Sequence, residues 1–417
     1  EDVIPSTVYY EISSDGNYAY VTGGNGTHLV IDDYYRGLPV RKINNIAFQG
    51  NKMIKTIKFP NTLKKIGDYA FSECQNLKSI LLPDSIEYLG ESAFGMYLGN
   101  SERPNVKSII MPASLKTIMS GALECWTTEK IYIYCKNSNW MQNCLNAGSV
   151  KATQLKYLNI SSIEDWCSNH LATFEECPFA YSSKDGSIIF NNIAFNGTLT
   201  IPEDVSYIGE HTFSRFAKLN KLIVSDGVRT ILSGAFYGCE NMTYAYVGDS
   251  VSVISDDAFE NCSRLDTLII GKSLKNFKAF TNCSSLKNIK ISDDNPYIKV
   301  KDNSVVTKDG TKLLYVFGKK SKFVLPESIS SIEVGAFDNA IIDTLVFNDN
   351  IVKIPTRFLA DNKTIKSVVL GNSVKEIGAE AFKNTNLKNV VLPETLDSIG
   401  NKAFSNSMLE AVTIPSS

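Results

Sequence analysis

The sequence is poor in the residues that most often carry catalysis and metal binding. Its 417 residues include only three histidines, His28, His170 and His211, and three tryptophans. Lysine and arginine number 42 against 44 aspartates and glutamates, so no net charge attracts nucleic acid or an anionic membrane. No apolar run approaches the ~20 residues of a membrane-spanning helix. With 43% hydrophobic and 21% charged residues, the chain has the composition of a folded protein.

The motifs of common enzyme and metal-binding families are missing as well. There is no GxxxxGK[ST] loop, no GxSxG elbow, no HExxH and no EF-hand loop. Cys167, His170 and Cys177 form the one grouping that hints at a metal, but it has neither a CxxC pair nor a second histidine. If the same residues formed a catalytic pair of cysteine nucleophile and histidine base, they would lack the third group that orients the base. We therefore expect no catalytic residue, no metal and no cofactor, and predict that the protein is not an enzyme.

What the sequence has in abundance is an internal repeat. The phrase IGDYAF at 66–71 recurs as LGESAF at 89–94, IGEHTF at 208–213, IGAEAF at 377–382 and IGNKAF at 399–404. The large residue that ends the phrase occurs twelve times in three blocks of four, which excludes chance. These positions are Phe48, Phe71, Phe94 and Leu123; Phe213, Phe236, Phe259 and Phe280; and Phe337, Phe358, Phe382 and Phe404.

Each repeat combines one short strand with one turn. In the unit at 63–83, residues 80–82 alternate with a period of two, and Pro83 ends the strand because proline cannot donate to a ladder. The half that contains Ala70 and Phe71 has helix-like spacing but is too short for more than one or two turns. We expect Ala70 to be small because the turn packs tightly, and Phe71 to fill the interior. Such a unit cannot bury its own apolar face, so neighbouring units must stack into a solenoid.

The stretch LKKIGDYAFSECQNLKSILLPDSIEYLGESAF at 63–94 resembles the BspA-like leucine-rich repeat family, which occurs on surface proteins of gut and oral bacteria. Residues 294–337 are similar to the connector of that family, NP…DG-x-L…IP, and residues 163–213 match it more loosely. The resemblance implies an α/β repeat solenoid, a right-handed leucine-rich-repeat superhelix of 22–23-residue units with short parallel strands and short helical or irregular turns. It is specific for fold and only weakly specific for function.

The remaining segments fit around this solenoid. Residues 1–40 are expected to form an N-terminal capping hairpin, with a turn at Asp15-Gly16-Asn17, and a strand at His28–Ile31. Residues 41–417 form the solenoid, with blocks 41–123, 199–291 and 323–417, irregular coils 124–198 and a connector 292–322. In the irregular coils, KIYIYC and LKYLNI predict two further strands, followed by helical stretches around Trp140–Ala147 and Ser162–His170.

The nine cysteines fall into two groups. Cys74, Cys239, Cys262 and Cys283 each stand three residues after a repeat phenylalanine, which predicts a small buried apolar position. Stacked coils bring Cys239 and Cys262 close, but parallel side chains disfavour a disulfide. In the irregular coils the sequence allows one disulfide but does not indicate which two cysteines would form it. The cysteines there are Cys125, Cys135, Cys144, Cys167 and Cys177.

The outward faces of the strands carry the candidate binding residues. On either side of each inward residue, two columns point to the opposite face of the sheet. The first column is small and polar except at Tyr244, and the second is mostly apolar. A long exposed apolar stripe indicates a surface that binds a partner. The alternative is that the stripe reflects strand propensity alone, because β-branched residues suit parallel strands even on a solvated face. Tyr244 and Tyr246 are the best anchors because aromatic residues dominate binding hot spots. The candidate residues are Tyr244, Tyr246, Ile223, Ile269, Leu81, Ile110, Val346, Val369 and Val391.

The family resemblance implies bacterial adhesion and a host extracellular-matrix or cell-surface protein as partner. We predict a non-enzymatic, mainly monomeric recognition module that is extracellular or on the cell surface, with its signal peptide removed ahead of Glu1. Two alternatives remain open: a structural spacer that projects another module, and a glycan-binding module that uses the tryptophans of 124–198. Those residues are Trp126, Trp140 and Trp166. Clustered tryptophans are more often part of a core than of an exposed glycan-binding platform.

Overall fold

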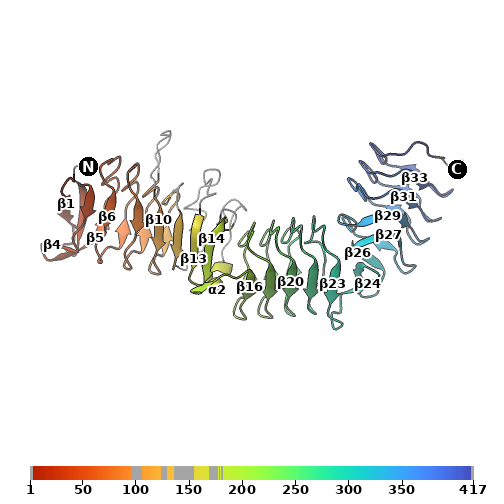
Figure 1. Cartoon of the computed structure of the whole chain (residues 1–417), viewed down its shortest axis with the longest axis horizontal. Helices are drawn as coiled ribbons and strands as arrows, with labels where there is room; N and C mark the ends of the chain where they lie inside the picture. Colours follow the sequence, from red (N-terminus) through yellow and green to blue (C-terminus); the bar gives the residue numbers. More distant parts are fainter. Residues whose placement is uncertain are drawn as a thin grey trace. The chain divides into compact units, whose positions relative to one another are not determined.

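The computed structural model of the chain describes residues 3–95, 106–123, 129–135, 155–168, 177, 179 and 182–414 (Figure 1). The chain forms two compact units. Unit 1 consists of Glu1–Gly197 and Ile208–Ala217, and unit 2 of Thr198–Tyr207 and Lys218–Ser417. In both units, short parallel strands of successive coils stack into ladders, which confirms the predicted repeat solenoid.

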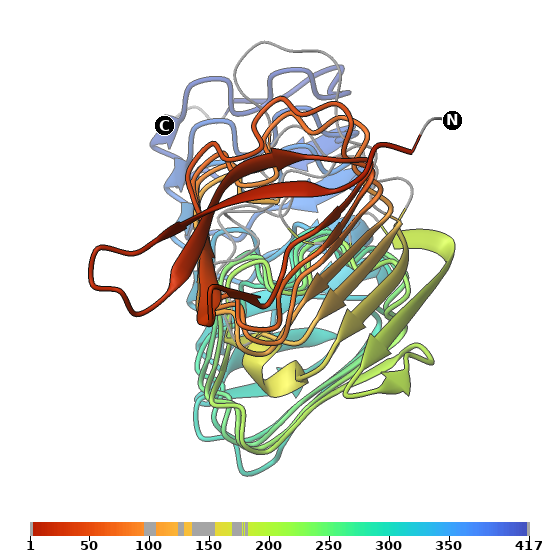
Figure 2. The ribbon, with the colours of Figure 1, turned by 90° about the vertical axis from the view of Figure 1, so that its left-hand side faces the viewer.

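Unit 1 begins with the predicted hairpin. Strands β1 (Thr7–Ile12) and β2 (Ala19–Asn25) pair antiparallel, and their turn contains Gly16 at a φ of +69°. Figure 2 shows this hairpin in front of the coils that follow it. The hairpin is joined to the solenoid because β2 pairs in parallel with β5 (Leu38–Ile43). Nearby strands are β3 (His28–Val30), which pairs with β6 (Thr56–Lys58), and β4 (Tyr34–Tyr35).

The coils of unit 1 contribute strands to two ladders. The first contains the predicted strands and, at its end, an antiparallel pair that was not predicted; the second contains one longer strand and several two-residue strands, which were not predicted either. The first ladder continues through β8 (Ser79–Leu81), β10 (Ser108–Met111), β12 (Lys130–Ile133), β13 (Leu155–Ile160), β14 (Ser182–Phe190) and β15 (Ile193–Ala194). The second runs from β5 through β7 (Lys65–Ile66), β9 (Tyr88–Leu89) and β11 (Thr117–Ile118).

Unit 2 contains two blocks of coils joined by an antiparallel meander. The first block is built on β16 (Thr198–Ile201), β18 (Lys221–Val224), β20 (Tyr244–Val247), β22 (Thr267–Ile270) and β23 (Asn288–Ile291). The meander consists of β24 (Ile298–Lys301), β25 (Ser304–Thr307) and β26 (Lys312–Val316). The second block is built on β27 (Lys319–Val324), β29 (Ile341–Val346), β31 (Ser367–Val369) and β33 (Asn389–Val391).

Two-residue strands accompany these ladders in unit 2 as well. They are β19 (Thr230–Ile231), β21 (Val253–Ile254), β28 (Ser331–Ile332), β30 (Lys353–Ile354), β32 (Glu376–Ile377) and β34 (Ser398–Ile399), while β17 (Tyr207–Ile208) falls at a boundary between the units in the sequence.

The repeat turns are irregular rather than helical. Tyr69 and Glu73 have φ values of 56° and 61°, which an α-helix does not contain. The turns are held by bonds between coils, such as the one from the Phe71 N–H to the Ala93 carbonyl at 2.7 Å. Ala70 is fully buried, as its small size predicted. Among the described residues, α2 (Ile163–Cys167) is the only α-helix.

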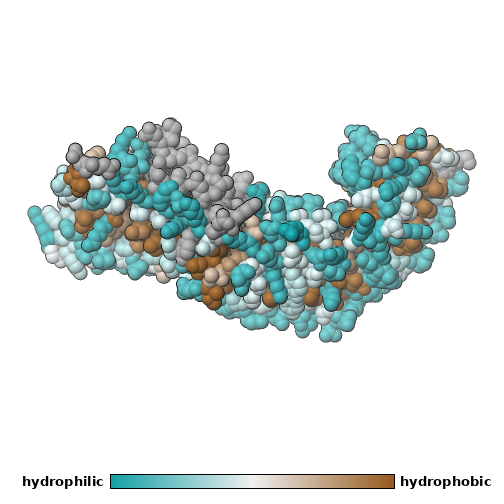
Figure 3. All heavy atoms as spheres, viewed as in Figure 1, coloured by the Kyte–Doolittle hydropathy of each residue, from teal (hydrophilic) through white to brown (hydrophobic). Residues whose placement is uncertain are grey.

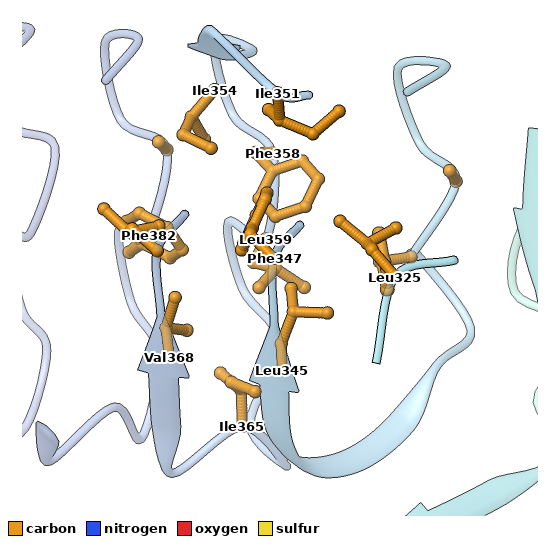
Figure 4. Packing of buried hydrophobic residues seen from close by; sticks show 14 of the residues in the cluster. Leu325, Leu345, Phe347, Ile351, Ile354, Phe358, Leu359, Ile365, Val368 and Phe382 are labelled. Carbon is orange, nitrogen blue, oxygen red and sulfur yellow. The ribbon is translucent and has the colours of Figure 1, made fainter. Parts of the chain in front are cut away.

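Repeat phenylalanines in contact form the centre of each core, face to face in the earlier blocks and mostly edge to face in the last block. The rings of Phe71 and Phe94 lie parallel with their centroids 5.2 Å apart. Phe259 stacks on Phe236 and on Phe280, each at 5.1 Å. Aliphatic side chains from the strands close the interior; Figure 4 shows this packing in the last block. Its labelled residues are Leu325, Leu345, Phe347, Ile351, Ile354, Phe358, Leu359, Ile365, Val368 and Phe382.

The irregular coils continue the ladder of unit 1. Both predicted strands are present, because β12 pairs in parallel with β10 and with β13. Helix α2 begins after Ser162, whose hydroxyl accepts a hydrogen bond from the Asp165 N–H at 3.0 Å. The predicted helical stretch Trp140–Ala147 lies outside the described residues, as does His170 at the end of the other.

The described cysteines are all buried. They are Cys74, Cys135, Cys167, Cys177, Cys239, Cys262 and Cys283. Cys239 and Cys262 form no disulfide with each other, in agreement with the prediction, whereas Cys125 and Cys144 lie outside the described residues. The Cys74 thiol donates to the Phe48 carbonyl of the preceding coil at 3.3 Å. Burial raises the pKa of this thiol to about 12.

Candidate binding surface on the strand face

The predicted site residues lie on the outward sides of three separate sheets. Strand register places Leu81 beside Ile110 in unit 1. In the two blocks of unit 2, it places Tyr246 beside Ile223 and Ile269, and Val369 beside Val346 and Val391. The apolar column is therefore divided into three patches. On the face visible in Figure 3, apolar residues likewise reach the surface in separate groups among hydrophilic ones.

The most distinctive patch lies on β18, β20 and β22. We call Ile223, Tyr244, Tyr246 and Ile269 the tyrosine patch. All four side chains are partly exposed, whereas Ala245, between the two tyrosines, is fully buried. The alternation of β20 therefore turns both tyrosines to the same open face. This is the arrangement that the repeat alignment predicted.

Charged residues border the tyrosine patch. The Lys221 ammonium lies 4.9 Å from the centroid of the Tyr244 ring, which is cation–π distance. Partial burial, followed by the negative charges of Asp226 and Asp249, raises the pKa of Tyr246. The Tyr246 phenol therefore stays protonated at neutral pH and can donate a hydrogen bond to a partner.

A shallow depression of about 660 Å³ adjoins the patch at Tyr244. Its polar side chains are already engaged with one another. The Asp266 carboxylate contacts the Lys287 ammonium at 2.5 Å and accepts a hydrogen bond from the Thr267 hydroxyl at 2.8 Å. The bond from Lys287 is the largest cause that lowers the pKa of Asp266. Arg264 donates to the Asn241 side chain at 3.2 Å. The surface thus combines an apolar centre with an ordered polar edge, the usual anatomy of a protein interface.

The predicted residues of the other two patches are aliphatic, and each patch also contains a residue that the repeat alignment missed. Leu81 is 49% exposed, and Val391 is 63% exposed. Register adds Tyr132 of β12 beside Ile110, and Val324 of β27 beside Val346. Tyr132 belongs to an irregular coil and Val324 to the strand that follows the connector. Alternation within KIYIYC and KSKFVL was the signal that could have identified them.

The histidines and acidic residues do not assemble a metal centre in the described part of the chain. No group of three or more histidine, cysteine, aspartate or glutamate side chains is placed there to hold a metal ion. His28 is exposed, with its Nδ1 2.8 Å from the Thr56 hydroxyl. His211 is half-buried, and its Nδ1 lies 3.4 Å from the Ser214 hydroxyl. No helix within the described ranges has the length and apolar character to cross a membrane.

Trp166 belongs to the core. It is 2% exposed, and its indole N–H donates to the Thr212 carbonyl at 3.0 Å. Its ring meets Phe179 edge to face, with the centroids 5.7 Å apart. A platform for glycans at Trp166 is therefore ruled out by its burial. Trp126 and Trp140 lie outside the described residues.

Comparison with protein families agrees with the repeat. The model of the BspA type leucine rich repeat region matches residues 41–179, 184–303 and 312–417, in six copies. The comparison with curated proteins finds no match.

Solved structures of other proteins are similar to this chain at low identity. A leucine-rich repeat protein from Bacteroides ovatus is 19% identical, with 97% of this chain and 92% of that chain covered and a TM-score of 0.40. The pneumococcal vaccine antigen PcpA is 19% identical, with coverages of 99% and 82% and a TM-score of 0.46. A leucine-rich cell surface protein from Faecalibacterium prausnitzii is 18% identical, with coverages of 100% and 96% and a TM-score of 0.37.

Proposed function

Because this chain belongs to the BspA-type leucine-rich repeat family, we propose that it is a non-enzymatic recognition module, secreted or displayed on a bacterial surface. Its partner is a protein of a host's extracellular matrix or cell surface. The contact is made by the strand face, centred on the tyrosine patch. The observation that carries this proposal is the placement of Tyr244 and Tyr246 on one open face, with Ile223 and Ile269 on the neighbouring strands.

The geometry of the patch suits a protein partner. Strands in a ladder lie ~4.8 Å apart, so the Tyr246 ring and its two isoleucine neighbours form a continuous apolar surface. Hydrogen bonds between coils hold the backbone of the patch, and little conformational entropy is lost when a partner binds. Lys221 and Asp249 supply charges of both signs at its border. Those charges would select among partners more than they would add affinity.

The test is binding of the purified chain to immobilised fibronectin, fibrinogen, collagen and mucin. A Tyr246→Asp/Ile269→Lys variant places one negative and one positive charge in the patch. A Val253→Asp/Val352→Lys variant is the matched control, since these valines are 45% and 50% exposed and do not belong to β18, β20 or β22. Circular dichroism spectra and melting curves of the three proteins must agree before binding is compared.

We expect the parent and the control variant to bind one of these ligands equally. The patch variant should lose about 2 kcal/mol or more of binding free energy, roughly a 30-fold weaker affinity. Equal binding by the patch variant would move the contact away from the tyrosine patch. If the parent binds none of the ligands, the matrix-binding role is wrong, and a spacer that projects another module becomes the better explanation.

A further inference from the structure

A cavity of about 340 Å³ lies in unit 2, where the first block of coils meets the meander. Its lining comes from four places in the chain. These are the turn after β21, the turn around Phe277, strand β26 and the turn after β28. The volume falls within the range of small-molecule sites, ~300–1,000 Å³. The cavity is separate from the tyrosine patch, because the two share no lining residue.

The cavity exists because the stack of repeat phenylalanines is interrupted here. Beyond Phe280, the next rings are not those of another regular coil. The Phe277 ring contacts Phe280 with centroids 4.9 Å apart, and Tyr315 of β26 lies 5.0 Å from Phe277. The meander thus inserts an aromatic side chain where a repeat turn would otherwise continue, and space remains beside it.

The floor of the cavity is apolar and rigid. Phe277 is 2% exposed and Tyr315 is 4% exposed. The Tyr315 hydroxyl donates to the Phe280 carbonyl at 3.3 Å and accepts from the Asn339 amide at 2.8 Å. Because its polar atom is satisfied by the protein, Tyr315 can offer only its ring to a ligand. Since little of either ring is exposed, the apolar surface open to an alkyl chain comes mainly from Val334 of the same lining, which is 67% exposed.

The walls of the cavity are strongly acidic. Asp256, Asp257, Glu260 and Asp338 all line it. Among the described residues of the lining, Lys278 is the only cation, and it pairs with Glu333 at 3.5 Å. Glu333 contacts Lys312 as well, at 2.6 Å. Glu333 shares its one negative charge between these two lysines. The lining nevertheless keeps an excess of negative charge, because four carboxylates face the single ammonium of Lys278.

The four carboxylates differ in the hydrogen-bond and charge partners that the protein supplies. Asp257 accepts hydrogen bonds from the Ser233 hydroxyl at 2.8 Å and from the Gly234 N–H at 3.2 Å. Arg357 lies near Asp338, but it is paired with Glu380 at 2.7 Å and with Asp361 at 3.3 Å. Partial removal from water raises the pKa of Asp338, and the charge of Arg357 opposes this shift.

We propose that this cavity binds an organic cation, an ammonium or guanidinium group on an apolar stem. The stem lies against Val334, and the charged end lies among Asp256, Glu260 and Asp338. Polyamines and the side chains of lysine or arginine in a polypeptide share this chemistry. A purely apolar ligand would leave the carboxylates unpaired, and an anion would be repelled.

The test is a calorimetric titration of the whole chain with two cations and one neutral analogue. The cations are cadaverine and Nα-acetyl-lysine methylamide; the analogue is Nα,Nε-diacetyl-lysine methylamide, which keeps the stem and loses the charge. A Glu260→Gln/Asp338→Asn variant removes two charges from the cavity. A Glu394→Gln/Asp397→Asn variant removes two from exposed positions elsewhere in unit 2 and is the matched control. Circular dichroism checks the fold of each protein, and Asp256→Asn is a milder second variant.

We expect at least one cation to bind, the neutral analogue to bind about tenfold more weakly, and added salt to weaken binding. The cavity variant should lose about tenfold in affinity, while the control stays within twofold. Tighter binding of cadaverine would identify free polyamines as the source of the bound cation. Tighter binding of the lysine derivative would identify a polypeptide as that source. The proposal is overturned if the neutral analogue binds as tightly as the cations, or if the cavity variant and the control variant have the same affinity for the cations. It is also overturned if neither cation binds at a concentration of about 10 mM. Because the Tyr246→Asp/Ile269→Lys variant should keep its cation binding, this test is independent of the matrix-binding role.

Discussion

The side-chain amide of Asn339 donates a hydrogen bond over 2.7 Å to the backbone carbonyl of Phe280, 59 positions earlier in the chain. In several regular coils, the equivalent carbonyls accept hydrogen bonds from cysteine thiols. The Cys283 thiol, for example, donates to the Phe259 carbonyl at 3.3 Å. After Phe337, the position of the cysteine is occupied by Ala340, which has no donor. Asn339 and the Tyr315 hydroxyl therefore replace the thiol at the junction of the two blocks.

Replacement of Asn339 should destabilise this junction. In an Asn339→Ala variant, the Phe280 carbonyl and the Tyr315 hydroxyl both lose a donor in a water-poor site. We expect the free energy of unfolding to fall by about 1–3 kcal/mol, measured by urea denaturation. Asn401→Ala, at an exposed position, should change it by less than about 0.5 kcal/mol. Equal effects of the two substitutions would show that the bond contributes nothing.

The position of a phenylalanine within its stack should determine the cost of its removal. Phe259 is fully buried between Phe236 and Phe280, so Phe259→Ala should lower the free energy of unfolding by about 3–5 kcal/mol. Phe404 is only partly buried and stacks on Phe382 alone at the end of its block. Phe404→Ala should cost clearly less in the same denaturation experiment. The stacking order would be unimportant if both variants lost the same stability.

Stability should depend on pH through Glu87, which links three successive coils. Its carboxylate contacts the Lys116 ammonium at 2.7 Å and the Lys64 ammonium at 2.8 Å. These bonds, from Lys116 first and Lys64 second, lower the pKa of Glu87 from its ordinary 4.5 to about 2. A lowered pKa stabilises the folded state above pH 4.5, and this contribution disappears as the pH falls toward 2.

The parent should therefore melt at a higher temperature than Glu87→Gln at pH 6, and the gap should narrow steadily toward pH 2. Differential scanning calorimetry at several pH values measures this gap. Glu394→Gln, at an exposed carboxylate, controls for the loss of one negative charge. A gap that stays constant between pH 6 and pH 2 would contradict the role of the lysine contacts.

The buried thiols should resist alkylation in the folded protein. Burial raises the pKa of Cys74 to about 12, and burial is also the main cause that raises the pKa of Cys262. Since the thiolate is the reacting form, iodoacetamide at pH 8 should leave the seven described cysteines unmodified. Peptide mass spectrometry reads each site separately, and the protein unfolded in guanidinium is the positive control. Rapid labelling of Cys262 in the folded chain would mean that its coil opens locally.

Much of the architecture followed from the residues because each coil packs mainly on neighbours of its own kind. The intervals between Phe236, Phe259 and Phe280 place three rings in one stack, and the positions of Cys262 and Cys283 place their thiols beside it. Alternation around Ala245 was enough to turn Tyr244 and Tyr246 to one open face. In a repeat, local pattern and tertiary environment carry the same information.

The two-residue strands could not be predicted in this way, because a pair such as Lys65–Ile66 has no periodicity of its own. It becomes a strand only because β5 and β9 pair with it on either side. For the same reason, the division of the apolar column into three patches could not be seen in the aligned sequence. It depends on where each ladder of hydrogen bonds ends.

Sequence by itself thus determined the repeat, its stacked core and the side chains that face outward from each strand. Tertiary structure alone decided how the blocks of unit 2 are joined. The meander carries Tyr315 to Phe277 and brings Asn339 to Phe280, and the acidic cavity forms beside them. These contacts join segments with unrelated patterns, so they are set by the path of the backbone and have no counterpart in the repeat.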